Sequence, residues 1–370
     1  MQPSTSLIAS APLFCKIDRT HQARLIGEVA AILREEESHK AAIFDESFWS
    51  WQYLDLPTKK ANVYAALVDE QIKGYYHVPL YRGRVNGQPK LFASVQDVAI
   101  KKEMRGGGVF RQLAEFATAD LERAGVDLIY TFPNHKSIRT FLKYNAYAQI
   151  ATFKMYVLPV RSGDLLHTRF KLAGMEKIAG FGVDKLLRFF SVAAEPDLKV
   201  QQHPAIDQSI STVFAAYQKA HVVAVERDAA YLRWRYEQRP HSKHVIYSIA
   251  RDGMPLLAAA IFKYDEMFDN PALLLMDFAF VPDGEKYLLQ LIQEVKERGQ
   301  QSDTDRFHLI FATGNNRFFQ QLTKIGFISV PEKFNPRPLN LLVKNISSQD
   351  AATPLQANHW HVTLGDWDVF

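Results

Sequence analysis

The residues best suited to chemistry form a short glycine-rich segment, Arg105-Gly106-Gly107-Gly108, between an apolar run and an amphipathic stretch. This order predicts a strand, a turn and a helix, with flexible glycine backbone directly at the helix N-terminus. The N–H groups of a first helical turn and the helix dipole favour an anion there, and Arg105 adds a formal positive charge. The segment therefore predicts a binding site for a phosphate-bearing ligand.

Two common phosphate-binding motifs do not fit this segment. A P-loop has Lys followed by Ser or Thr after its last glycine, whereas this chain has Val109 and Phe110. A dinucleotide-binding fold has its glycine loop after the first strand of a parallel unit, whereas this loop follows an antiparallel meander. A glycine cluster before a helix is also typical of a plain structural turn, so the surrounding elements have to identify the ligand.

Acidic side chains are the candidates for proton transfer. Asp97 lies in the strand that precedes the loop, where a carboxylate could act as a general base. Asp366 lies in the C-terminal segment NHWHVTLGDWDVF, together with Asp368, Trp360 and Trp367. We name Asp97 and Asp366 as candidate catalytic residues. The alternative for Asp97 is a structural role. The alternative for Asp366 is a place in an exposed acidic tail that is anchored by tryptophan.

An internal repeat organises the chain. The segment DESFWSWQYLDLP (45–57) aligns without a gap with DAAYLRWRYEQRP (228–240), and both have Asp first, Trp seventh, Tyr ninth and Pro last. Further pairs follow at an offset of about 180 residues, among them SVQDVAI beside LLMDFAF and IYTFPN beside IFATGN. The repeat predicts two halves with the same fold.

Hydrophobic periodicity predicts a mixed α/β order in each half. In the first half we expect a helix over 21–40, strands near 62–69, 73–82 and 90–101, a helix over 108–124, a strand over 127–132, a helix over 135–145 and a strand over 151–158. The second half repeats this order to about Ile346. The expected domains are 1–160 and 201–346, joined by a helical linker over 161–200 and followed by a tail over 347–370.

The composition of the 370 residues excludes several classes of protein. The chain is 47% hydrophobic and 23% charged, as in soluble globular proteins, and its net charge of +4 gives no field that would favour nucleic acid. The single cysteine, Cys15, excludes an intramolecular disulfide and any multi-thiolate metal site, and the histidines do not cluster, so we expect no metal. Without a secretory signal pattern or a membrane span, we expect a cytoplasmic protein, whose oligomeric state the sequence leaves open.

Two segments resemble a known family. Arg105, Gly108 and Val109 resemble the pyrophosphate-binding motif A of the GNAT superfamily of N-acetyltransferases, Arg/Gln-x-x-Gly-x-Gly/Ala, with Phe110 departing at the last position. The segment YTFPNHKSIRTFLKYNAY resembles motif B, in which a strand ends in a polar residue, here Asn134, and a helix follows. The chain therefore resembles a tandem-GNAT acyltransferase.

The second half departs from the family at the phosphate loop. Its segment FVPDGEKYLLQL has Asp283 and Glu285 where motif A has its basic residue and glycines. Two carboxylates at that position would repel a pyrophosphate. We therefore expect a degenerate second GNAT-like half and one working cofactor site per chain.

The resemblance implies transfer of an acyl group from acetyl-CoA or another acyl-CoA to a primary amine of a small molecule, with an amino sugar of glycan biosynthesis as one candidate acceptor. It also implies that the backbone of the third long strand binds the pantetheine and polarises the thioester carbonyl. The implied cofactor-binding residues are Val98, Ala99, Ile100, Arg105, Gly106, Gly107, Gly108, Val109, Phe110 and Asn134. The tyrosine that family members often use as an acid is replaced here by Leu142.

Two other functions remain open at this point. A FemABX-like aminoacyl transferase is also a tandem GNAT fold, but it needs no intact pyrophosphate loop, so the loop at Arg105–Gly108 argues against it. A non-catalytic CoA-binding regulator would explain the missing tyrosine and the altered second half. In the leading interpretation, the second half forms a wall of the acceptor cleft and the tail closes it.

Overall fold

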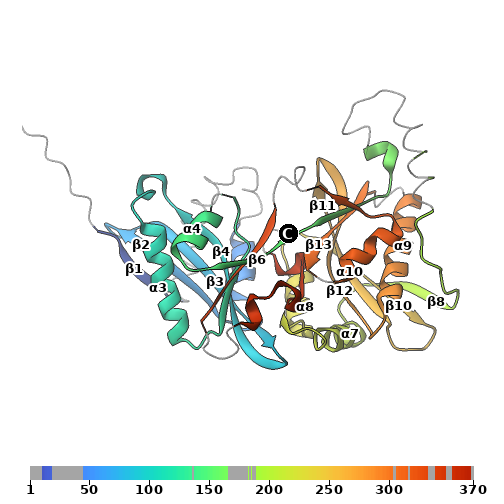
Figure 1. Ribbon diagram of the computed structural model, residues 1–370, viewed down its shortest axis with the longest axis horizontal. Helices are drawn as coiled ribbons and strands as arrows, with labels where there is room; N and C mark the ends of the chain where they lie inside the picture. Colours follow the sequence, from blue (N-terminus) through green and yellow to red (C-terminus); the bar gives the residue numbers. More distant parts are fainter. Residues whose placement is uncertain are drawn as a thin grey trace, which may run out of the picture.

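The protein consists of two halves, each built on a mixed sheet of eight strands (Figure 1). The computed structural model describes residues 11–18, 45–135, 137–165, 182, 185, 189–302, 306–315, 317–331, 338–346 and 352–367. The expected helix over 21–40 lies outside these residues, as does most of the expected helical linker. The two sheets confirm the prediction of a mixed α/β protein with two GNAT-like halves.

The first sheet begins as an antiparallel meander and continues with a parallel strand. Its strand order is β1-β2-β3-β4-β5-β15-β6, and β9 pairs with β3. The bounds are β1 (Leu13–Ile17), β2 (Ala61–Val68), β3 (Gln71–Val85), β4 (Gln88–Ile100), β5 (Leu128–Thr131), β6 (Ala148–Phe153), β9 (Val223–Val225) and β15 (Leu339–Asn345). Strands β4 and β5 are parallel because α3 (Val109–Arg123) crosses between them.

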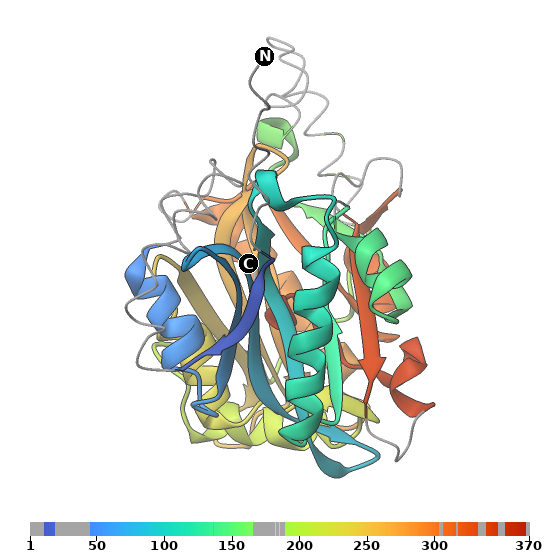
Figure 2. The same cartoon turned by 90° about the vertical axis from the view of Figure 1, so that its left-hand side faces the viewer.

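Helices cover both faces of the first sheet. The apolar side of α3 packs with Phe141 of α4 (Ile138–Tyr144) on one face, and Figure 2 shows both helices in front of the sheet. On the other face, α2 (Glu46–Trp49) and the π-helical turn η2 (Ser50–Leu54) pack against alternate residues of β2 and β3. A short 3-10 helix, η3 (Lys102–Met104), follows β4.

The second sheet repeats this architecture, in the order β14-β7-β13-β12-β11-β10-β8, with β16 beside β13. Its strands are β7 (Met155–Pro159), β8 (Leu198–His203), β10 (Lys243–Arg251), β11 (Ala258–Met267), β12 (Asn270–Phe280), β13 (Leu309–Asn315), β14 (Ile328–Val330) and β16 (Val362–Thr363). Its helices are α7 (Gln208–Gln218), α8 (Ala229–Tyr236), α9 (Glu285–Gln301), α10 (Arg317–Gln321) and η4 (Leu322–Ile325). The C-terminal segment adds η6 (Thr353–Leu355), η7 (Ala357–His359) and η8 (Leu364–Asp366).

The halves exchange strands, and the second half also contributes β9 to the first sheet. β7 follows β6 in the chain but pairs with β13 and β14 of the second sheet. Likewise, β15 follows β14 but pairs with β5 and β6 of the first sheet, where it is visible as the orange-red strand of Figure 2. Sheet membership therefore does not follow chain order, so the predicted domain boundaries do not coincide with the two sheets.

Most of the predicted elements are present, with two differences. The strand expected over 151–158 is two strands, β6 and β7, separated only by Lys154. The first strand, β1, was not predicted from the sequence, since it is short and pairs with β2 at the sheet edge. Among the described residues, no helix is long and apolar enough to cross a membrane.

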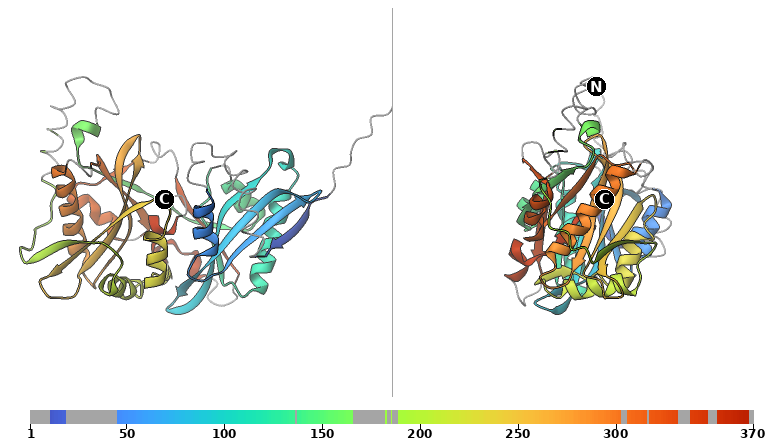
Figure 3. Two further views of the ribbon diagram at one scale, coloured as in Figure 1. Left: turned by 180° about the vertical axis from the view of Figure 1, so that it is seen from behind. Right: turned by 90° about the vertical axis from the view of Figure 1, so that its right-hand side faces the viewer.

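The repeated tryptophans join the halves. The rings of Trp51 and Trp234 stack with centroids 4.8 Å apart, at an interplanar angle of 15°. Each indole donates to the backbone carbonyl of the other residue, over 2.7 Å from Trp51 Nε1 and 2.8 Å from Trp234 Nε1. The turn η2, which follows α2, thus meets α8 between the two sheets (Figure 3), inside one apolar core that both halves share.

We predict that replacing Trp51 or Trp234 by Phe lowers the free energy of unfolding by roughly 1–3 kcal/mol, because a buried carbonyl loses its donor. The double variant should lose less free energy of unfolding than the two single variants together, since both hydrogen bonds belong to one stacked pair. Trp49→Phe is the matched control, because Trp49 is also buried but its Nε1 has no hydrogen-bond partner. Denaturant unfolding of the four variants measures the energetic coupling between Trp51 and Trp234. Strictly additive losses in the double variant would contradict the prediction.

Candidate active site

The loop after β4 has its backbone turned outward. Gly106 and Gly108 have φ values of 84° and 78°, in the left-handed region that glycine adopts without strain. Arg105–Gly108 are exposed, and a Cβ added to Gly106 would meet no atom within 4 Å. Helix α3 begins at the next residue, so the N–H groups of its first turn, which lack helical acceptors, are at the same place. The loop therefore fits an anion that approaches the backbone closely.

Side chains on either side of the loop hold it in position. Arg105 Nε donates to the carbonyl of Ile100 over 2.8 Å, which ties the loop to the end of β4. Val109 is buried, and the Phe110 ring packs edge-on against Phe141 and Tyr76, with centroids 5.3 and 6.3 Å away. Phe110 therefore serves the packing of α3 against α4 and β3, while its backbone stays in the first turn.

Strand β4 pairs with β5 over only part of the length of β4. Their parallel register runs from Phe92 beside Leu128 to Val95 beside Thr131. Beyond Val95, β4 keeps its pairing with β3, where Ala99 faces Tyr75 and Ile100 faces Gly74. The β5 side of Val98–Ile100 is thus outside the β4–β5 ladder, as a pantetheine that hydrogen-bonds to this strand would require.

A β-bulge places Asp97 at the point where β4 and β5 separate. Between the pairs Tyr75–Ala99 and His77–Gln96, two residues of β4 oppose one residue of β3. Asp97 has a φ of 39°, which Asp tolerates better than most side chains. Its side chain is half-buried, and its Oδ2 accepts a hydrogen bond of 2.5 Å from the hydroxyl of Tyr53.

The partners of Asp97 were not predicted as site residues. Tyr53 and Gln52 belong to η2, and Gln52 Nε2 donates to Gln96 Oε1 over 2.7 Å. Gln96 Nε2 in turn donates to Ser94 Oγ over 3.2 Å, so a polar chain runs along β4. The one available sequence signal was the repeat itself, because Tyr53 is the ninth residue of the repeated segment.

Asn134 and the helix that follows show how the motif B segment is built. Asn134 is exposed, and its Oδ1 accepts from the backbone N–H of Ser137 over 3.1 Å, so its side chain closes the turn before α4. Ser137 is the N-cap residue of this helix, but its side chain makes no cap hydrogen bond and donates to Asn134 instead. Leu142 is partly exposed on α4, and Ala146 has a φ of 56° where the second half has Gly326.

Comparison with known proteins agrees with this geometry. Residues 31–146 match the family model described as an acetyltransferase (GNAT) domain. This region of the chain is therefore similar to a GNAT domain. No curated protein matches the chain.

Solved structures extend the fold of the GNAT domain to the whole chain. A probable N-acyltransferase of unknown function from Enterococcus faecalis V583 covers 92% of this chain and 74% of its own, with a TM-score of 0.64 and 13% identity. A GCN5-related N-acetyltransferase from Anabaena variabilis covers 90% and 73%, with a TM-score of 0.58 and 12% identity. N-myristoyltransferase of Saccharomyces cerevisiae with bound myristoylCoA covers 93% and 86%, with a TM-score of 0.58 and 12% identity. At these identities the likeness concerns the fold.

The second half lacks the open loop of the GNAT domain. Gly284 is buried, and a Cβ there would lie 2.6 Å from the carbonyl oxygen of Val281. Its N–H donates to that same carbonyl over 2.8 Å, which makes a closed turn. Asp283 and Glu285 are exposed on either side of it. The turn thus offers neither an outward backbone nor a positive charge to a phosphate.

In the second half, strands β12 and β13 correspond to β4 and β5. The C-terminal segment lies against these two strands beyond the end of their ladder. The ladder between β12 and β13 ends at Leu274 beside Phe311, and β16 then pairs with β13 at Gly314 and Asn315. The following turn, η8, contacts both β12 and β13, and the position of a Cβ on Gly365 would lie 3.2 Å from Asp277 Oδ2. In the second half, the chain itself therefore occupies the region beyond the paired part of these two strands.

Asp366 belongs to this filled site. Its Oδ2 accepts from Arg227 Nη2 over 2.6 Å, and Arg227 Nε donates to Asp277 over 2.7 Å. All three side chains are buried, so Asp366 is not part of an exposed acidic tail. Burial raises the pKa of Asp277, and Arg227 opposes that rise. Asp368 and Phe370 lie outside the described residues.

The tryptophans of the segment are also buried. Trp360 packs against Phe92 and Tyr130 of the first half, with centroids 6.0 and 5.9 Å away, and its Nε1 donates to the carbonyl of Pro354. Trp367 is buried as well. The segment thus crosses from the first half to the second and fixes their relative position.

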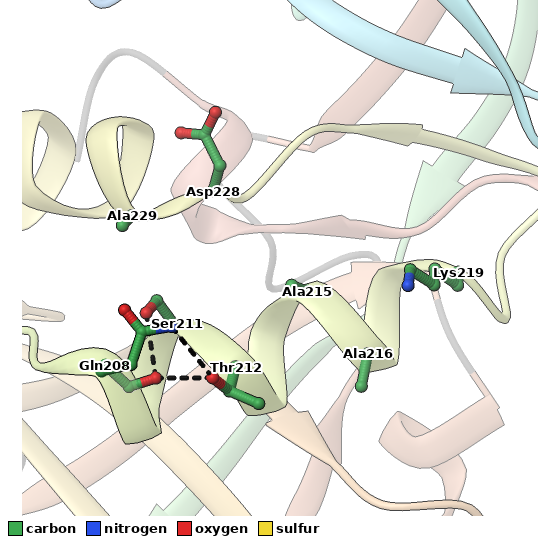
Figure 4. A pocket seen from close by; sticks show the side chains of 8 residues that line it. All are labelled: Gln208, Ser211, Thr212, Ala215, Ala216, Lys219, Asp228 and Ala229. Carbon is green, nitrogen blue, oxygen red and sulfur yellow. Dashed lines mark hydrogen bonds between the residues drawn. The ribbon is translucent and has the colours of Figure 1, made fainter.

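A shallow groove of about 360 Å³ lies between α7 and the start of α8, lined among others by Ser211, Thr212, Lys219 and Asp228 (Figure 4). None of the predicted site residues lines this groove. Among the described residues there is also no group of three or more His, Cys, Asp or Glu side chains that could hold a metal ion.

We predict that acid loosens the C-terminal segment through two stacked histidines. His221 and His361 stack with centroids 4.4 Å apart. Burial, with Arg227 nearby, lowers the pKa of His221 to about 4 and holds the pKa of His361 well below its usual value. Between pH 6.5 and about 4 the unfolded chain binds protons that the folded chain does not, so stability falls with pH in this window. His221 alone should account for ~2 kcal/mol of the loss between pH 7 and 5.

The variant that checks this is His221→Phe, which keeps a ring but does not titrate. Denaturant unfolding at both pH values should show a smaller difference for this variant than for the wild type. His135→Phe is the control, because His135 is exposed. An unchanged pH dependence in His221→Phe would show that His221 is already protonated in the folded protein at pH 5.

Proposed function

We propose that the protein is an acyl-CoA-dependent N-acyltransferase that acylates a primary amine of a small molecule. One observation carries the proposal: residues 97–110 combine a carboxylate at the β4 bulge, strand backbone outside the β4–β5 ladder and an exposed glycine loop at a helix N-terminus. These three features occur in the order that one extended acyl-CoA molecule would meet them. The second half has none of the three in an open form.

Acyl-CoA would supply an activated thioester, and the chain's own backbone would hold it. The N–H groups at Gly106–Phe110 would bind the pyrophosphate, with Arg105 adding positive charge. The backbone of Val98, Ala99 and Ile100 would hydrogen-bond the pantetheine and polarise the thioester carbonyl. Asn134 would reach the pantetheine only with its amide nitrogen, since its Oδ1 accepts from Ser137.

Asp97 is the base in this proposal. It would take a proton from the acceptor ammonium, so that an N–H bond breaks and an O–H bond forms on the carboxylate. The amine nitrogen then attacks the carbonyl carbon, a C–N bond forms, the C–S bond breaks, and the second proton lost by nitrogen balances the one gained by the thiolate. Asp366 is left out of this role, because its contact with Arg227 holds it in the second half.

The assay should cover several acceptors and several acyl chains. Amino sugars of glycan biosynthesis are our first candidates, tested beside other primary amines. Both acetyl-CoA and a long-chain acyl-CoA belong in the assay, since similar folds include N-acetyltransferases and a myristoylCoA-binding enzyme. We place this reaction in the cytoplasm, where acyl-CoA would be available.

We predict that Gly108→Trp abolishes binding of acyl-CoA, with the Kd rising by more than about tenfold, because a large side chain would cover the first turn of α3. Gly87→Trp is the matched control: Gly87 has a similar φ of 75°, lies in the β3–β4 turn and has open space around its Cβ position. Calorimetric titration with acetyl-CoA measures both. Equal binding by the two variants would place the phosphate site elsewhere, and no binding by the wild type would favour a FemABX-like donor.

We further predict that Asp97→Asn lowers the rate of CoA thiol release by roughly 10²- to 10⁴-fold while leaving acyl-CoA binding intact. The amide keeps the size of the side chain but cannot accept the proton. Thiol release is followed with a chromogenic disulfide, and binding by calorimetry on the same preparation. Full activity of Asp97→Asn would remove the base assignment, and wild-type binding without turnover on any amine would indicate a CoA-binding regulator.

A further inference from the structure

We propose that Tyr53 is a positioning residue for Asp97, and that, of the two duplicated Tyr–Asp pairs, only Tyr53–Asp97 serves the reaction. This inference rests on the proposed function, because it gives Asp97 a task in acyl transfer. It is carried by a comparison of the two halves.

The pair occurs twice. Tyr53 donates to Asp97 Oδ2 over 2.5 Å, and Tyr236 donates to Asp277 Oδ2 over 2.9 Å. Both tyrosines are the ninth residue of the repeated segment, and both aspartates lie at a bulge in the third long strand of their half. A hydrogen bond between the helical segment and the strand is therefore part of the inherited fold.

The copy in the second half is closed. Asp277 is fully buried and accepts from Arg227, Tyr236, Thr363 and the backbone N–H of Phe278. Gly365 lies directly against it, so that a side chain there would strike the Tyr236 hydroxyl at 2.1 Å. Nothing can approach this carboxylate without moving the C-terminal segment.

The copy in the first half has different surroundings. Asp97 is half-buried instead of fully buried, and it is joined to Gln52, which occupies the position of Arg235 in the repeat. Gln96 stands where the second half has Met276. Gln52 and Gln96 are neutral, whereas Asp277 forms an ion pair with Arg227.

The polar groups around Tyr53 carry a free-energy penalty that the fold does not require. Trp49 Nε1, Gln52 Oε1 and both ring nitrogens of His77 are buried without a hydrogen-bond partner, and the rings of Trp49 and His77 lie 4.4 and 4.6 Å from that of Tyr53. Each such group is expensive to leave unpaired. The second half has Leu232 and Ile261 in the positions of Trp49 and His77 and reaches the same fold. The cluster is therefore retained for its effect on Tyr53 and Asp97.

That effect is to fix the carboxylate and to favour its ionised form. A hydroxyl that donates to Oδ2 stabilises the charged carboxylate more than the neutral acid. It also sets the plane of the carboxyl group, and the close ring contacts of Tyr53 keep the hydroxyl in place. Tyr53 acts through Asp97 and has no separate role in bond making.

The test compares Tyr53→Phe with Tyr236→Phe, which removes the same hydroxyl from the closed copy. In Tyr53→Phe, the acidic limb of the kcat/KM profile for thiol release should move up by about one pH unit, because the ionised form of Asp97 loses a donor. In Tyr236→Phe, the free energy of unfolding should fall while the pH profile stays in place. Equal profiles for wild type and Tyr53→Phe, or equal shifts in both variants, would overturn the inference.

A second measurement does not depend on turnover. The 13Cγ signal of Asp97, assigned by its absence in Asp97→Asn, should titrate at higher pH in Tyr53→Phe than in the wild type and unchanged in Tyr236→Phe. Failure of the proposed function would appear as full activity of Asp97→Asn with this titration shift intact. Failure of the inference would appear as an unmoved titration in a protein whose activity still depends on Asp97.

Discussion

The stacked and reciprocally hydrogen-bonded pair of Trp51 and Trp234 holds the two halves in one arrangement. Each indole donates a hydrogen bond to the backbone carbonyl of the other residue. The contact is therefore self-complementary, like a contact between the subunits of a symmetric dimer. The exchange of β7 and β15 is also reciprocal, because with these strands each half extends the sheet of the other. Neither sheet is complete without the opposite half, and the two share one apolar core.

This arrangement explains why the halves could diverge in function without losing their fold. The backbone framework, the Tyr–Asp hydrogen bond and the tryptophan contact are common to both. In the second half, a closed turn at Gly284 and the inserted segment at Gly365 fill the space that a ligand would need. In the first half, the glycine loop is exposed and the β4 backbone beyond Val95 lies outside the β4–β5 ladder.

Local patterns predicted the conformation of the glycine loop well, because its elements are neighbours in the chain. Arg105–Gly108 and the start of α3 form the expected loop, because the strand, glycine turn and helix are contiguous in the chain. Asn134 was predicted from the resemblance to motif B, and its side chain is engaged in the turn before α4. Tyr53 and Gln52 were not found, because no local pattern indicates a contact with a strand more than forty residues away.

The sequence by itself determined the duplication, the order of helices and strands and the single glycine loop, because these depend on periodicity and on residues that are neighbours in the chain. Only the tertiary structure decided which carboxylate is accessible. Asp97 and Asp277 occupy matching positions in the repeat, yet Arg227 and Asp366 cover one of them. Asp366 comes from a segment almost ninety residues beyond Asp277, and a contact at that separation is fixed by packing of the whole fold, not by local preference.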